Sequence, residues 1–334
     1  MSLLAPLARR AVDAAMEATV VPSFSRIGYA VRSRLYPGWQ DLDTFGLTGR
    51  RVVVTGANSG LGYATAERLA GLGASVHLLV RSDEKGRDTV ARIATATGST
   101  DVTFGVADLA DLASVRAFAA DVVERFEHVD ALVHNAGAMF SQRRETVDGI
   151  ETTFQVHVVG PFLLTGLLLP ALRAAPRPPA RVVWVTSGGM YTEKLDVAKF
   201  ESPDDYRPAV AYARAKRAQV VLTDLLGQRL DREEVVVHTM HPGWAATPGV
   251  ERSLPVFNRV MGPILRSPEE GADTTVWLVA ADAPTRVSGE LWLDRAVRGP
   301  HKLPVTRSSD TEAQRLWAKV VAQAGVEPSV VRTT

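Results

Sequence analysis

A chain of 334 residues, 46% of them hydrophobic and 22% charged, has the composition of a soluble globular protein and is long enough for one large domain or two ordinary ones. Its formal net charge of +1 excludes a strong overall field that would recruit nucleic acid or strongly acidic partners. Because cysteine is absent, disulfides, thiolate metal sites and cysteine nucleophiles are excluded, which fits a reducing cytoplasm.

Residues 1–45 form an extension before the first predicted strand. Segment 2–21 is compatible with a helix whose apolar residues lie partly on one stripe, and segment 26–39 adds arginines and aromatic residues. Such an arm either packs on the domain or on a partner subunit, or lies on a membrane surface. We expect packing, because apolar stripes more often serve packing, and keep peripheral membrane contact through residues 1–40 as the alternative.

From residue 50 onward, β-branched apolar runs alternate with longer amphipathic segments. Near-continuous apolar runs are typical of strands covered on both faces, and repeated strand–helix–strand units imply right-handed crossovers. We therefore predict one α/β domain over 46–305, a doubly wound parallel sheet of about seven strands with helices on both faces, and then a C-terminal helix and tail over 306–334. The predicted strands are 51–56, 75–81, 101–108, 131–137, 181–187, 234–240 and 290–295.

The segment TGANSGLG, residues 55–62, links the first predicted strand to the first predicted helix. Gly56 permits the tight turn, Gly60 lets the backbone approach a pyrophosphate, and Gly62 allows close helix–strand packing. The N–H groups at the helix N-terminus favour a bound phosphate. A glycine-rich turn alone is weak evidence, but the strand before it and the helix after it indicate dinucleotide binding.

The end of the second strand bears on the choice between NAD and NADP. An NAD site has an acidic residue there for the ribose hydroxyls, whereas this chain has Val80 followed by Arg81. Because a guanidinium suits a 2′-phosphate, we expect NADP(H) to be favoured over NAD(H). A solvated arginine at a strand end is the alternative.

Residues 209–230 have a helical pattern that places Tyr212 and Lys216 one turn apart on one face. The pKa of an unperturbed tyrosine is about 10, too high for efficient proton exchange at neutral pH. A nearby ammonium and an oxidised nicotinamide would both favour the phenolate, so we expect a lowered pKa for Tyr212. The alternative is a surface tyrosine beside a solvated lysine.

Six motifs in order give the chain a resemblance to the short-chain dehydrogenase/reductase family over about residues 50–305. Within the family, VTSGGM, YARAKRAQVVLT and MHPGWAATPGV are most similar to the dehydrogenase/reductase family member 12 group, near the retinol-dehydrogenase-like branch. The resemblance implies a Rossmann-type fold and an oxidoreductase. The motifs are the glycine-rich turn, Asp108, HNAG (134–137), Ser187, Tyr212 with Lys216, and HPGWAAT (241–247).

The resemblance also implies a role for each residue. Hydride passes between the nicotinamide and a substrate carbonyl carbon, while Tyr212 donates or removes the proton on oxygen. Lys216 stabilises the phenolate and holds the ribose hydroxyls, and Ser187 polarises the substrate oxygen. The cofactor-binding set is Gly56, Asn58, Ser59, Gly60, Leu61, Gly62, Arg81, Asp108 at the adenine end, Leu109, Asn135, Ala136 and Gly137 beside the ribose, Tyr212, Lys216, Pro242, Gly243, and Thr247 at the carboxamide.

One catalytic position departs from the family pattern. Where the family has an asparagine that helps to hold a water between the lysine and solvent, the stretch FQVHVVG (154–160) places His157. His157 either substitutes functionally, or distorts the relay and slows turnover, or marks a protein that binds cofactor without efficient catalysis.

The region 246–267 follows the sixth strand and is rich in Pro, Gly, Leu and Val. It is either a lid over a lipophilic substrate or a packed surface helix, and we favour an apolar alcohol or carbonyl as substrate. No histidines or carboxylates have credible metal-site spacing. Helices carrying 150–172 and 209–230 often form the dimer interface in this family, which makes a homodimer or tetramer one expectation.

The leading expectation is thus an NADP-dependent oxidoreductase located in the cytoplasm or at a membrane surface. The second is a cofactor-binding regulator or scaffold that turns over little, for which His157 is the only support. A third, a membrane-surface interaction protein, rests on the N-terminal arm and is compatible with the first.

Overall fold

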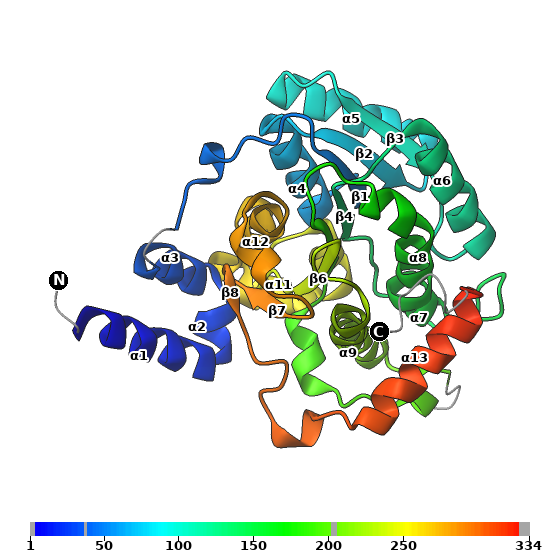
Figure 1. Cartoon of the computed structure of the whole chain (residues 1–334). Helices are drawn as coiled ribbons and strands as arrows, with labels where there is room; N and C mark the ends of the chain where they lie inside the picture. Colours follow the sequence, from blue (N-terminus) through cyan, green and yellow to red (C-terminus); the bar gives the residue numbers. More distant parts are fainter. Residues whose placement is uncertain (1–3, 37–38, 202–205, 327–334) are drawn as a thin grey trace.

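The computed structural model describes residues 4–36, 39–201 and 206–326. Within these ranges the strands form one sheet in the order β3-β2-β1-β4-β5-β6-β7-β8, parallel from β3 to β7 and antiparallel only at β8 (Figure 1). The predicted α/β fold is confirmed, and β8 is the one unpredicted strand. The strands are β1 (Arg51–Thr55), β2 (Ser75–Val80), β3 (Val102–Val106), β4 (Ala131–His134), β5 (Ala180–Val185), β6 (Val235–Met240), β7 (Leu291–Leu293) and β8 (Ala296–Val297).

Helices cover both faces of the sheet, which explains why its central strands are apolar on both sides. Every residue of β4, β5 and β6 is buried. One face carries α4 (Gly60–Gly71), α5 (Asp83–Thr97) and α12 (Pro268–Ala280), and the other carries α6 (Leu112–Arg125), α8 (Gly160–Arg173), α9 (Pro208–Arg229) and α13 (Asp310–Ala324).

The strand order reverses at β1, which pairs with β2 on one side and with β4 on the other. Open α/β sheets bind their ligands at such a switch point, outside the carboxyl ends of the strands. The segments that follow β1 to β6 carry the predicted site residues.

The apolar segment Thr152–Arg173 is long and apolar enough to cross a membrane by length and composition, yet 83% of its apolar window is buried in the fold. It consists of α7 (Thr152–Phe154), a π-helical turn (Gln155–Val159) and α8. It packs as a core helix of the domain. Its π-helical turn contains His157, and such turns are frequent at functional sites.

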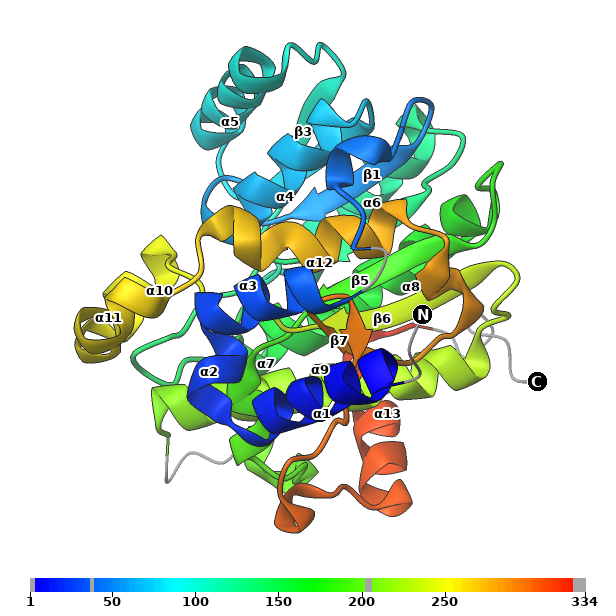
Figure 2. The same ribbon diagram turned by 90° about the vertical axis from the view of Figure 1, so that its left-hand side faces the viewer.

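The N-terminal arm consists of α1 (Leu4–Ala18), α2 (Val20–Phe24) and α3 (Arg26–Leu35). It packs against the domain beside β7, as Figure 2 shows, and Arg32 of α3 is joined to Asp294 just after β7. Packing on the domain is therefore the alternative that the structure supports. Val12, Val20, Val21 and Ile27 of the arm remain exposed.

Two further helical segments bear on the predictions. α10 (Pro248–Ser253) and α11 (Pro255–Met261) protrude at one end of the molecule, and none of their residues, all of which the structure describes, is buried (Figure 2). At the C-terminal end, α13 buries Leu316, Val320 and Ala324 against α8 and α9. The last part of the predicted tail, 327–334, lies outside the described residues.

Candidate active site

The glycine-rich turn and the loop after β4 interlock. The Asn135 side-chain amide donates to the carbonyl oxygens of Thr55 (3.1 Å) and Gly56 (3.2 Å). A Cβ on Gly56, whose φ is +67°, would lie 2.6 Å from the Cα of Ala136, and one on Gly62 would lie 2.3 Å from the Asn135 amide nitrogen. Only glycine fits at these two positions, so the sequence keeps the two loops in direct contact.

The start of α4 is open to an anion. Ser59 stands at the N-cap with its side chain exposed, and it caps no backbone N–H among the described residues. The first N–H groups of this helix therefore remain available, as a phosphate site requires. Asn58 precedes the helix, and Gly60 (φ +56°) is the first residue of its first turn. Leu61 packs beside Gly271.

The loop after β6 reaches the same turn. A Cβ on Gly60 would lie 3.3 Å from the Cβ of Thr247, which places Thr247 beside the glycine-rich turn. The Thr247 hydroxyl accepts a hydrogen bond from the Val250 N–H and so begins α10. Pro242 is buried, and Gly243 has a φ of +71°. The predicted cofactor residues of three loops thus converge.

The remaining predicted cofactor residues lie along the same edge. Asp108 is exposed and accepts from the Ala110 N–H, which shapes the turn after β3, and the neighbouring Leu109 is buried. Arg81 is exposed at the end of β2 and forms no hydrogen bond or ion pair with any residue that the structure describes. Val80, at the position of the acidic residue in NAD sites, is buried.

The catalytic candidates Ser187, Tyr212 and Lys216 come together at the end of β5. Lys216 on α9 donates from Nζ to the Val185 carbonyl at 2.8 Å, and its Nζ lies 5.4 Å from the centre of the Tyr212 ring. Ser187 lies close enough to Tyr212 for its side chain to act on the pKa of the phenol. Because α9 is held against the end of β5, its tyrosine is presented to the residue that follows the strand.

His157 lies beside this group with both ring nitrogens engaged. Nδ1 is 2.8 Å from the Thr153 carbonyl oxygen and Nε2 is 3.2 Å from the Ala138 amide nitrogen. A carbonyl can only accept and an amide N–H can only donate, so the ring is the neutral tautomer protonated at Nδ1. It packs edge-on against the Tyr212 ring, with centroids 5.3 Å apart. In this geometry His157 braces the loop after β4.

The family model described as short chain dehydrogenase matches residues 50–255. The chain belongs to the short-chain dehydrogenase family. The chain is therefore an NAD(P)-dependent oxidoreductase.

Two relatives and one solved structure are similar to this short-chain dehydrogenase over most of its length. Dehydrogenase/reductase SDR family member 12 from Bos taurus is 39% identical over 276 residues, which are 80% of this chain and 83% of that protein. Polyprenol dehydrogenase from Mus musculus is 37% identical over 294 residues, 83% and 84% of the two chains. The structure described as a Pseudomonas aeruginosa RhlG/NADP active-site complex has 26% identity and a TM-score of 0.61, covering 74% of this chain and 95% of that one. The resemblance to the member 12 group is confirmed.

The electrostatics of this short-chain dehydrogenase differ from the expectation for Tyr212. Burial raises the pKa of Tyr212 to about 12, although the Ser187 side chain acts in the opposite direction. Burial also lowers the pKa of Lys216 to about 7, so its ammonium is only partly populated at neutral pH. The ammonium and an oxidised nicotinamide together were expected to lower the pKa of Tyr212; burial acts in the opposite direction here, and the combined effect with the nicotinamide stays a prediction.

Burial, together with the nearby Lys216, lowers the pKa of His157 to about 3. The imidazole therefore stays neutral across the physiological range. The backbone carbonyl of His157 accepts a hydrogen bond from the Gln219 side-chain amide at 2.8 Å. Together with the ring contact to Tyr212, this is a second link between the π-helical turn and α9.

Two threonines that the sequence analysis missed hold the site together. The Thr55 hydroxyl accepts from the backbone N–H groups of Asn135 (3.1 Å) and Ala136 (3.0 Å). The Thr186 hydroxyl donates to the Lys216 carbonyl at 2.8 Å. Both stand at or just after the end of a strand that leads into the site, which is the signal that could have drawn attention to them.

Proposed function

We propose that this chain is an NADP(H)-dependent oxidoreductase that acts on an alcohol or carbonyl group of a lipophilic small molecule, with Tyr212 as the acid/base. The observation that carries the proposal is the meeting of Ser187, Tyr212 and Lys216 at the end of β5, beside the loops that would hold the cofactor. The bound cofactor would supply or accept the hydride.

The protein residues would divide the remaining work. The Tyr212 hydroxyl would give its proton to the substrate oxygen in reduction, and the Lys216 ammonium and the bound cofactor would have to lower its raised pKa for this step to be efficient. The Ser187 hydroxyl would donate a hydrogen bond to the same oxygen as charge develops on it. Lys216, fixed by Val185, would hold the ribose hydroxyls and favour the phenolate in the reverse direction.

Arg81 supports the preference for NADP(H). Its exposed guanidinium, free of protein partners among the described residues, is available to a 2′-phosphate, and the buried Val80 offers no carboxylate to a ribose hydroxyl. The RhlG structure is described as containing NADP.

A lipophilic substrate is supported by the helices α10 and α11. A packed surface helix would bury an apolar face, but these two helices bury none of their residues, and Val256 and Val260 are 73% and 69% exposed. We propose that this apolar segment is the lid. One relative is named a polyprenol dehydrogenase, and a polyprenol is a lipophilic alcohol of the proposed substrate class.

The test is a panel of apolar aldehydes, ketones and alcohols, with NADPH or NADP⁺ followed by absorbance, and with Tyr212→Phe as the matched control. We expect turnover of at least one apolar substrate, and a loss of about 100- to 10,000-fold in kcat for the variant, the usual contribution of a general acid. NADPH binding should survive in Tyr212→Phe. Binding of NADPH without turnover across the panel would instead favour the regulatory or scaffold alternative.

Peripheral membrane contact through residues 1–40 is a second proposal that the first does not exclude. The exposed Val12, Val20 and Val21 of the arm support it. Flotation of the full chain with liposomes, compared with a variant in which these three valines are replaced by serine, would test it.

A further inference from the structure

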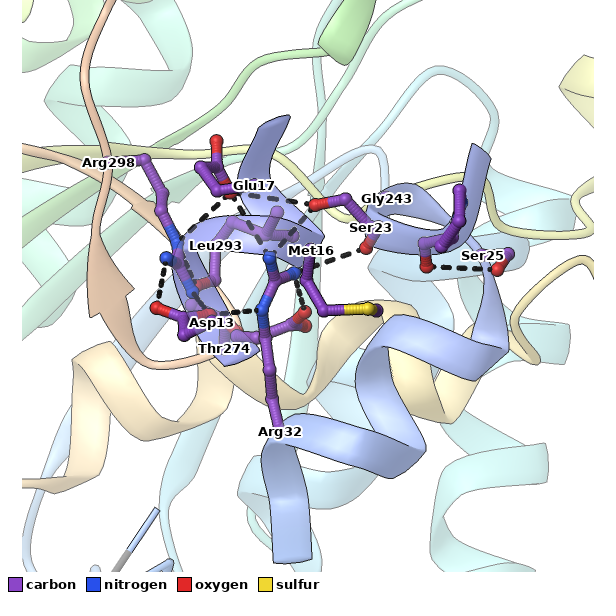
Figure 3. Close-up of polar contacts among 12 residues, drawn as sticks. Asp13, Met16, Glu17, Ser23, Ser25, Arg32, Gly243, Thr274, Leu293 and Arg298 are labelled. Atoms are coloured by element: carbon purple, nitrogen blue, oxygen red, sulfur yellow. Dashed lines mark hydrogen bonds and ion pairs between the residues drawn. The ribbon is translucent and has the colours of Figure 1, made fainter. Parts of the chain in front are cut away.

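Arg32 in the N-terminal arm is fully buried, and each of its five N–H donors has an acceptor (Figure 3). Nε donates to Asp13 at 2.9 Å. Nη1 donates to Asp294 (2.8 Å) and to the Ser23 carbonyl (3.2 Å), and Nη2 donates to Glu17 (3.1 Å) and to the Ser23 hydroxyl (2.9 Å). One side chain therefore joins all three helices of the arm to the residue after β7.

A second buried guanidinium completes the attachment from the domain side. Arg266 binds Asp294 in a bidentate pair at 2.6 and 2.9 Å, and it also donates to the Ser23 carbonyl (3.0 Å) and the Ser25 carbonyl (3.2 Å). Removing one partner from such a network leaves a buried charge uncompensated. The arm is therefore held in a single position on the domain.

That position places Phe24, the last residue of α2, between the two loops of the active site. Its ring contacts His241 (4.6 Å) and Trp244 (5.9 Å) after β6, and Tyr191 (6.1 Å) after β5. A Cβ on Gly188, the residue after Ser187, would lie 2.7 Å from the Phe24 ring. A single buried ring thus supports the segment of the predicted catalytic serine and the segment that leads to Thr247.

The backbone of the arm fixes the second loop directly. The Trp244 N–H donates to the Phe24 carbonyl at 2.7 Å. A Cβ on Gly243 would lie 2.5 Å from that carbonyl oxygen and 2.4 Å from Nε of Arg266, so only glycine fits at this position of the loop. Trp244 in turn packs edge-on against Phe257 of α11, with centroids 5.2 Å apart. The contacts run from the arm through the loop to the proposed lid.

We propose that the N-terminal arm is a positioning element of the active site, with Phe24 as the positioning residue that sets the geometry of the loops after β5 and β6. The consequence for turnover rests on the proposed oxidoreductase function, whereas the consequence for loop order does not. Among the described residues, Phe24 forms no ring contact or hydrogen bond with Tyr212 or Lys216, so it acts through the two loops.

The test compares Phe24→Ala with Phe24→Leu, which retains most of the apolar volume, and with Val21→Ala on the exposed side of the same helix. Hydrogen exchange is measured on the full chain by mass spectrometry, for peptides that cover 186–193, 241–247 and, as a reference, β2. We expect exchange in Phe24→Ala to rise about 10-fold in both loops but not in β2, to be partly restored in Phe24→Leu, and to stay unchanged in Val21→Ala. In the same variants, kcat should fall about 10- to 100-fold in Phe24→Ala while the NADPH Kd changes little, because a small misplacement of reacting groups is costly.

Two results would overturn the inference: unchanged exchange in both loops of Phe24→Ala, or an equal rise in β2, which would mean that the ring stabilises the whole fold and not these loops. If Phe24→Ala does not fold, the Phe24→Leu exchange pattern decides by the same criterion. If the unaltered chain turns over no substrate, the proposed function fails, and the exchange data still decide the role of the arm.

Discussion

Lys216 donates a hydrogen bond from Nζ to the Val185 carbonyl oxygen at 2.8 Å, two residues before Ser187 in the chain. The contact buries the ammonium and holds α9 against the end of β5. Burial lowers the pKa of this lysine to about 7, so at neutral pH the fold tolerates the charge at a cost in stability.

Replacing Lys216 by methionine should therefore separate stability from activity. The pKa of Lys216 in the fold lies below its unfolded value of 10.5, so the charged form destabilises the fold below about pH 10, most strongly below about pH 7. Lys216→Met removes this penalty, which exceeds the roughly 1 kcal/mol of the lost hydrogen bond. We expect a higher urea midpoint at pH 6, a gain that shrinks towards pH 10, and a large loss of kcat. The exposed Lys199→Met serves as the control, and a lower midpoint for Lys216→Met at pH 6 would contradict the burial argument.

The same pKa predicts the pH dependence of turnover. Lys216 in the free protein is protonated below about pH 7 and loses its charge as the pH rises. Because kcat/KM for NADPH reports groups of the free enzyme, it should decline above about pH 7. In Lys216→Arg the guanidinium does not titrate in this range, so any residual activity should lack the decline. A flat profile for the unaltered chain between about pH 6 and 9 would speak against this assignment.

His157→Asn tests the role of the altered catalytic position. The shorter side chain cannot reach both the Thr153 carbonyl and the Ala138 N–H, which His157 bridges. Leaving one of these buried groups unpaired should cost about 1–3 kcal/mol in unfolding free energy and should lower kcat, as expected if His157 substitutes functionally. A large gain in rate would instead show that the imidazole slows turnover.

Arg81→Asp tests the cofactor preference. A lost charge-assisted hydrogen bond to a 2′-phosphate should raise the Kd for NADPH by about 10- to 100-fold, while NADH binding should hold or improve. Arg87→Ala is the control, because this exposed arginine on α5 is paired with Asp83 and lies outside the strand end. Tighter binding of NADH than of NADPH by the unaltered chain would end the assignment.

The parts of the structure that could be predicted from the sequence are those with a local cause. β5 and β6 read as near-continuous apolar runs because both of their faces are covered, and Gly56 and Gly62 were recognisable because only glycine fits the turn. The place of Thr247 in the cofactor site was implied by the family resemblance, and it lies after a strand at the carboxyl edge of the sheet, where ligands bind.

The parts that could not be predicted depend on contacts between distant segments. Arg32 and Asp294 are 262 positions apart, and nothing near either residue indicates that they would form a buried pair. The effect of burial on the pKa of Tyr212 was not foreseen for a similar reason, since the sequence shows the neighbouring lysine but not the loss of hydration of the phenol. Thr55 and Thr186 were overlooked because their partners belong to other elements.

Helix α13 covers part of the face of α8 and α9 that was expected to form the dimer interface. Trp317 of α13 packs edge-on against Phe162 of α8, and Arg229 of α9 stacks over the same indole. A second copy could reach this face of α8 and α9 only where α13 leaves it uncovered.

The position of β7 and α12 also limits how the chain can be shortened. The stretch that matches the family model ends at residue 255, before both elements, and begins after the arm. A recombinant fragment cut at those limits would lack β7, so the apolar β6 would become an unpaired edge strand that can pair with other molecules. Such a fragment should precipitate on expression, so homology limits are a poor guide to the smallest soluble unit of this protein.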